Sequence, residues 1–97
     1  MNYDVLVSFA GYVGSEQLYS VDANDEDEAI DLAIDEAADD LSSEETINQG
    51  DGEWLVEINF AGLAGITESY EVYGPSEDDA IEAALELAKD DLSGEIN

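Results

Sequence analysis

Carboxylates recur at every fourth position in two stretches of this chain. Residues 25–41 read DEDEAIDLAIDEAADDL, and residues 76–92 read SEDDAIEAALELAKDDL. Apolar residues at helical spacing predict an amphipathic helix in each stretch. Residues four apart are neighbours on a helix, and like charges there repel by about 0.2–0.5 kcal/mol per pair. Two ridges of acids are therefore predicted, and they consist of Asp27, Asp31, Asp35 and Asp39, then Asp78, Glu82, Glu86 and Asp90. A surface of this kind is suited to binding positive charge.

Further acids stand at the ends of both predicted helices. The C-terminus of a helix is the negative end of its dipole, where a basic residue would be stabilising. Both stretches instead end in an acid pair, Asp39–Asp40 and Asp90–Asp91, with Lys89 as the one base nearby. We interpret this repeated unfavourable placement as functional. The predicted partner-binding set is Asp27, Asp31, Asp35, Glu36, Asp39, Asp40, Asp78, Glu82, Glu86, Asp90 and Asp91.

The composition restricts the classes of function. Twenty-seven acids face a single lysine, and the chain has no arginine, histidine or cysteine. The commonest general base and the commonest metal ligands are therefore absent, so we expect neither an enzyme nor a bound cofactor or metal. A formal charge of −26 repels nucleic acid and anionic membranes, so the expected partner is a strongly basic protein surface. The opening residues show no signal peptide, which predicts a cytoplasmic protein.

An internal duplication organises the chain. A shift of 51 residues aligns 3–42 with 54–93 without a gap, and 17 of the 40 positions are identical. Alternating apolar residues predict strands over 3–9 and 17–22 before the first helix, and the same pattern returns from Trp54. Asp25 and Ser76 are the predicted N-caps of the two helices.

These elements predict one α+β domain over residues 1–97. It would consist of two ββα repeats, 3–42 and 54–93, joined by a polar linker at 43–53. A lone ββα unit cannot bury its apolar face, so we expect a four-stranded, mostly antiparallel sheet with both acidic helices on one face and a pseudo-twofold axis between the repeats. Leu6, Leu18, Leu55 and Tyr73 would face outward and could form a homodimer or target interface.

The linear charge density suggests what such a surface imitates. Residues 25–41 hold nine acids. At 1.5 Å per residue they span roughly 25 Å, or about one charge per 3 Å. A single DNA strand has about one charge per 3.4 Å. One helix thus matches one DNA strand, and the second helix could stand in for the other strand.

With this size, acid-to-base ratio and pair of acidic ridges, the chain resembles the small acidic DNA-mimic inhibitors of phages and other mobile elements. That class includes anti-CRISPR and anti-restriction proteins, and the resemblance implies action in the host cytoplasm if this protein is phage-encoded. The resemblance implies a protein that occupies the basic nucleic-acid-binding surface of a host defence complex, a CRISPR effector first and a restriction enzyme second, without itself binding nucleic acid. Members of the class share no common fold, so no residue role is transferred.

Three other interpretations stay open. The acids could serve only to hold water and cations in a halophile, although solvation requires neither ordered ridges nor the loss of arginine. An acidic adaptor of a basic protein would use the same physics without mimicry. The segment Asp22–Ala–Asn–Asp–Glu26 has the first spacings of a calcium loop, but Asp27 stands where that loop requires glycine.

Overall fold

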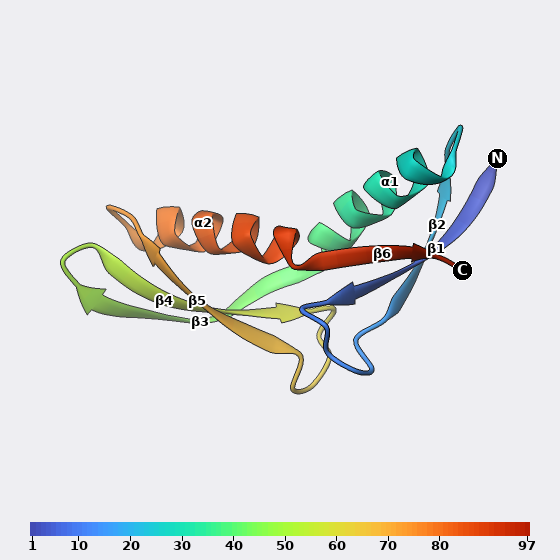
Figure 1. The fold of residues 1–97 in the computed structure, drawn as a ribbon. Coiled ribbons are helices and arrows are strands. Elements are labelled where there is room, and N and C mark those ends of the chain that lie inside the picture. The colour runs from blue at the N-terminus through green and yellow to red at the C-terminus, as the bar shows by residue number, and fades with distance from the viewer.

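The computed structural model describes residues 1–97 as six strands and two helices (Figure 1). The elements, in chain order, are β1 (Asn2–Phe9), β2 (Gln17–Asp22), α1 (Glu26–Ala38), β3 (Leu41–Gly50), β4 (Glu53–Phe60), β5 (Thr67–Tyr73), α2 (Glu77–Asp90) and β6 (Leu92–Ile96).

Both helices begin where the sequence predicts. The Asp25 carboxylate accepts a hydrogen bond from the Glu28 N–H at 2.8 Å, and the Ser76 hydroxyl accepts one from the Asp79 N–H at 3.3 Å. The helices end earlier than predicted, at Ala38 and Asp90. Each is followed almost at once by a strand, which begins at Leu41 in the first repeat and at Leu92 in the second.

The expectation of one four-stranded sheet is wrong. The structure has two three-stranded antiparallel sheets, which we call the β1 sheet (order β2-β1-β6) and the β4 sheet (order β3-β4-β5). Helix α1 packs on the β1 sheet and α2 on the β4 sheet. The α+β class is retained, but the third strand of each sheet was not predicted.

Each sheet takes its third strand from the other repeat. Strand β6 follows α2 but pairs with β1, so that Phe9 lies opposite Leu92; β3 follows α1 but pairs with β4, so that Phe60 lies opposite Leu41. Two equivalent backbone hydrogen bonds close the exchange, from Ala10 N–H to the Asp91 carbonyl at 2.9 Å and from Ala61 N–H to the Asp40 carbonyl at 2.8 Å. The two repeats are therefore interlocked.

Strand β3 occupies most of the segment expected to be a linker. Its sequence, LSSEETINQG, has little apolar alternation, and all but two of its residues are exposed. It is ordered by pairing along β4 rather than by burial, and the hairpin turns at Gly50, Asp51 and Gly52, all with positive φ. Such turns are typical of tight hairpins. Local composition does not reveal which strand a segment pairs with, so a polar strand such as β3 is predicted to be a linker.

A single hydrophobic core joins the two repeats. Phe9 and Phe60, which are equivalent positions of the two repeats and both fully buried, pack against each other with ring centroids 5.8 Å apart. The helices pack on the sheets through fully buried alanines at four-residue spacing, which are Ala29, Ala33 and Ala37 in α1 and Ala80, Ala84 and Ala88 in α2. Small side chains let each helix approach its sheet closely. The acids lie on the opposite, exposed face of each helix.

Candidate functional site

The two acidic helices lie end to end on the same side of the molecule (Figure 1). They run toward each other, so their C-terminal turns meet at the centre, and their N-termini lie at opposite ends. The expectation that the second helix would lie beside the first, in the place of the other DNA strand, is not met. The second ridge instead extends the first, and together they form one long acidic surface.

All eleven predicted partner-binding residues are exposed to solvent. Asp27 and Asp78 lie in the first turns, at the far ends of the molecule, so the structure does not bring them together. Asp35, Asp39 and Asp90 lie where the helices meet, close enough to act on the single lysine between them. The predicted set is therefore a continuous surface that is densest at its centre.

Lys89 occupies that centre. Its ammonium donates a hydrogen bond to Asp35 Oδ1 at 2.7 Å and thereby links the last turns of the two helices. The hydrogen bond to Asp35 and the charges of Asp35, Asp39 and Asp90 raise the pKa of the Lys89 ammonium. The negative ends of both helix dipoles also point to this region, so they add to the negative charge around Lys89.

Two of the eleven acids have structural roles that sequence reasoning missed. The Tyr19 hydroxyl donates to Asp40 Oδ2 at 2.5 Å, and the Tyr70 hydroxyl donates to Asp91 Oδ2 at the same distance. Burial, and then the hydrogen bond to the carboxylate, raise the pKa of both tyrosines. Asp40 and Asp91 thus have the local compensation that we took to be absent. The signal was present in the duplication, because both tyrosine–aspartate pairs recur at the same spacing of 21 residues.

Acids also cover the faces of the sheets that point away from the helices. Glu57 on β4 lies opposite Glu45 on β3, and Asp4, Glu71 and Glu95 stand on outward positions of other strands. Negative charge therefore surrounds the molecule. The ridges differ from this background in their regular spacing and in the meeting of the two dipoles, not in being the only acidic surface.

A cleft of about 370 Å³ lies between α1 and strand β2. It is lined by Ser20, Val21, Asp22, Leu32, Asp35, Glu36 and Asp39. The predicted partner-binding set includes three of its four acids, Asp35, Glu36 and Asp39, but not Asp22. No local signal could have done so, because the cleft exists only when β2 lies alongside α1.

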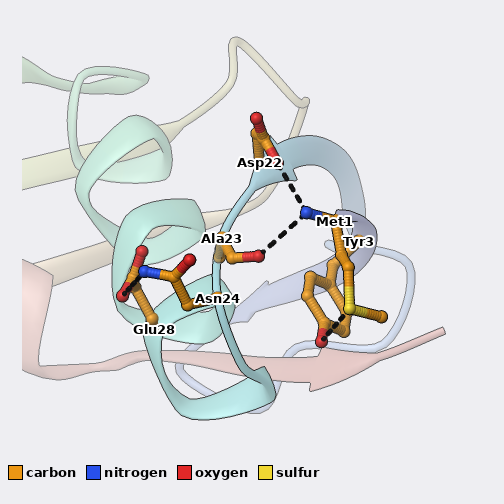
Figure 2. A network of polar contacts seen from close by, with 6 residues as sticks. All are labelled: Met1, Tyr3, Asp22, Ala23, Asn24 and Glu28. Carbon is orange, nitrogen blue, oxygen red and sulfur yellow. Dashed lines mark hydrogen bonds and ion pairs between the residues drawn. The ribbon is translucent and has the colours of Figure 1, made fainter.

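The calcium-loop segment has a different use. Asp25 caps α1, and the N-terminal ammonium of Met1 binds Asp22 Oδ1 at 2.9 Å and the Ala23 carbonyl at 3.2 Å (Figure 2). Asn24 donates to the Glu28 carboxylate at 3.4 Å. No group of three or more acids in the molecule is arranged to hold a metal ion.

The apolar residues expected to face outward are divided between the two sheets. Leu6 and Leu18 are cross-strand neighbours in the β1 sheet, whereas Leu55 lies opposite Ile47 in the β4 sheet. Tyr73 is 72% exposed at the edge of the β4 sheet. Neither helix is both long and apolar enough to cross a membrane.

Three comparisons with known proteins, made against family models, curated proteins and solved structures, give no match.

Proposed function

We propose that this protein is a DNA mimic that occupies the basic nucleic-acid-binding surface of a host defence complex and blocks the binding of DNA. The first expected target is a CRISPR effector, and the second is a restriction enzyme. The observation that supports the proposal is the distribution of the charge along an elongated molecule.

The linear charge density of the molecule is close to that of duplex DNA. Its longest extent is 49 Å, and its formal charge is −26, so 49 Å divided by 26 charges gives about one charge per 1.9 Å. Duplex DNA carries about one charge per 1.7 Å of axis. At about 3.4 Å per base pair, the length corresponds to roughly 14 base pairs. A channel that holds a short duplex would meet a similar total charge along a similar length.

The end-to-end helices supply the ordered part of this surface. Successive ridge carboxylates, such as those of Asp31 and Asp35, are about 6 Å apart along the helix axis, and the acids beside the ridge fill the intervals. A basic channel would bind these carboxylates in place of phosphates. Steering by the net charge would accelerate the encounter, and the affinity would fall with salt as it does for DNA.

Inhibition of DNA binding in a purified system tests the proposal. A panel of CRISPR effectors and restriction enzymes would be incubated with labelled target DNA and increasing amounts of the protein at about 150 mM salt. We expect the protein to displace DNA from at least one of them. The ridge variant would change Asp31 and Asp39 to Asn, Glu82 to Gln and Asp90 to Asn. None of these four side chains has an ion pair or a hydrogen-bond partner.

A matched variant separates the ridges from net charge. It would change Glu45, Glu57, Glu71 and Glu95 to Gln, which removes the same charge from the sheet faces. We expect the ridge variant to inhibit at least about tenfold less well, with a shallower dependence on salt, by roughly one unit of slope per lost contact. The sheet-face variant should inhibit nearly as well as the native protein. If no enzyme in the panel is inhibited and the protein unfolds below molar salt, the acids serve only solvation.

A further inference from the structure

The cleft beside β2 combines three features that the rest of the surface does not bring together. It is hollow, four of its seven lining residues are acidic, and it runs along a strand at the edge of a sheet. It is the one cleft that the molecule has. Each feature points to the same kind of ligand.

The free edge of β2 offers unused backbone groups. The Ala23 N–H donates to the Met1 carbonyl at 2.9 Å, in register with the pairing of Val21 with Tyr3. In an antiparallel pair the backbone groups of alternate residues point toward and away from the partner strand. The N–H and C=O groups of Ser20 and Asp22 therefore point away from β1. These two residues also line the cleft, so an incoming strand could pair there.

The charge of the cleft selects a cation. Both cations of this chain bind carboxylates that line it, the Met1 ammonium on Asp22 at 2.9 Å and the Lys89 ammonium on Asp35 at 2.7 Å. Glu36 and Asp39 have no ion pair. Both existing pairs are largely solvent-exposed, and exposed pairs are weak, so a partner's basic side chain could compete with them.

The equivalent surface of the second repeat lacks these features. A shift of 51 residues replaces Asp22 by Tyr73, Leu32 by Ala83 and Glu36 by Leu87. No cleft forms there, although β5 is also an edge strand and also packs beside a helix. The cleft is therefore a property of particular side chains in the first repeat and not of the duplicated fold.

We propose that β2 and this cleft bind an extended, arginine-bearing segment of a partner protein, which adds to β2 as a further strand. Alternate side chains of such a strand face the same side, so one arginine would enter the cleft against Glu36 and Asp39. The guanidinium presents five donors in a planar fork that fits carboxylates, and the aliphatic part of its side chain would contact Leu32, which is 37% exposed. The proposal rests on the proposed function for the basic character of the partner, and it adds a defined position and backbone pairing.

A synthetic peptide tests this site directly. The probe is a capped eight-residue peptide that alternates valine with arginine, titrated into the protein at about 150 mM salt and followed by NMR of the backbone amides. We expect the largest shifts at Leu18, Ser20 and Asp22, with accompanying shifts at Glu36 and Asp39. The equivalent amides on β5, those of Ser69, Glu71 and Tyr73, serve as the internal control and should shift much less.

Two pairs of variants separate strand pairing from charge. Ser20→Pro removes an edge N–H, and the matched Glu71→Pro removes the equivalent N–H on β5. Glu36→Gln with Asp39→Asn removes two charges from the cleft, and the matched Glu45→Gln with Glu57→Gln removes two from the face of the β4 sheet. We expect about a tenfold loss of peptide affinity for the first member of each pair and less than about a twofold loss for its control. A peptide with neutral citrulline in place of arginine should bind the native protein about as weakly as the arginine peptide binds the Glu36→Gln, Asp39→Asn variant.

The outcomes distinguish this proposal from the proposed function. Shifts spread evenly over the acidic surface, or equal losses in a variant and its control, would mean attraction by net charge alone and would overturn the site. The DNA-displacement result would be unaffected, because it depends on the acids along both helices and not on pairing with β2. Localised peptide binding without any displacement of DNA would support the site and reject the mimic. If Ser20→Pro does not fold by circular dichroism, the pair of charge variants decides the question.

Discussion

The two repeats have the same framework and different surfaces. Phe9 and Phe60, Tyr19 and Tyr70, and the buried alanines of the two helices occupy equivalent places. The lining of the cleft, in contrast, is only partly repeated: where the first repeat has Asp22 the second has Tyr73. Duplication preserved what holds the core together, and it left the two ends of the acidic surface free to differ.

The two hairpin loops also differ in the acceptor that they provide for an equivalent backbone N–H group. The Phe9 N–H donates to the Ser15 hydroxyl at 3.1 Å, whereas the equivalent Phe60 N–H donates to the Ile66 carbonyl at 3.1 Å. Tyr12 has no counterpart either. Its hydroxyl reaches from the first loop to β5 of the second repeat, where it donates to Glu68 Oε1 at 2.6 Å. The loops are therefore the place where the repeats hold each other asymmetrically.

The largest expected effect comes from breaking the shared core. Phe9→Ala should destabilise the protein by about 3–5 kcal/mol, because a fully buried aromatic ring is lost and a cavity is left. The only tryptophan, Trp54, belongs to the second repeat. Because the repeats exchange strands, urea unfolding followed by Trp54 fluorescence should coincide with unfolding followed by far-UV circular dichroism.

Phe60→Ala, at the equivalent position of the second repeat, provides the matched measurement. It should give a similar loss and again a single transition. Two separate transitions in either variant, with Trp54 reporting only one of them, would show that the repeats fold independently and would contradict the interlocked core.

The sequence predicted the framework of each repeat, because that framework depends on local patterns. Period-two alternation located β1 and β4, and the capping residues Asp25 and Ser76 located both helix starts. Strand β3 was missed because it is polar and is ordered by its hairpin with β4. Strand β6 was missed because it is short and pairs with β1, more than 80 residues away in the sequence. The division into two sheets follows from those two strands.

The candidate site likewise has some features that follow from local sequence patterns and others that depend on how distant segments pair. Exposure of the ridges follows from helical periodicity, so their acids could be selected from the sequence alone. The alignment of the helices end to end, and the cleft beside β2, depend on how strands are exchanged and could not be selected in this way. The tyrosine–aspartate pairs are an intermediate case, since the duplication contained them but their contact needed the structure.

A smaller effect is expected where the repeats differ within the core. Gly94 on β6 is packed so closely against α1 that an added Cβ would lie 3.1 Å from Ile30 Cγ2 and 3.3 Å from Val5 Cγ1. Gly94→Ala should therefore destabilise the protein by about 1–2 kcal/mol, since overpacking exceeds the gain from a less flexible unfolded chain. Ser43→Ala, at the equivalent and exposed position of β3, should change the unfolding free energy by less than about 0.5 kcal/mol. Urea unfolding measures both, and a Gly94→Ala protein as stable as the native one would mean that α1 can move away from β6 without cost.

The smallest expected effect concerns a feature that the repeats share. Tyr19→Phe and Tyr70→Phe each remove a hydrogen bond to a carboxylate at a partly exposed position, so each should cost about 1 kcal/mol at neutral pH. The two variants should be equal, because the bonds are equivalent. Unequal losses would show that one Tyr–Asp pair is more strongly coupled to its half of the core than the other.

The pH dependence follows from the raised pKa of both hydroxyls. Folding keeps them protonated at a pH where the unfolded chain, with a tyrosine pKa of about 10, has released its protons. The resulting stabilisation is complete below about pH 10 and is lost as the pH rises further, because the unfolded state then binds fewer protons than the native state. The native protein should lose stability as the pH rises above about 10. Tyr12 and Lys89, whose pKa values are also raised, contribute to the same loss. Urea midpoints of the Tyr19→Phe, Tyr70→Phe double variant should fall less steeply over the same pH range, and an unchanged slope would mean that the two hydroxyls do not titrate with folding.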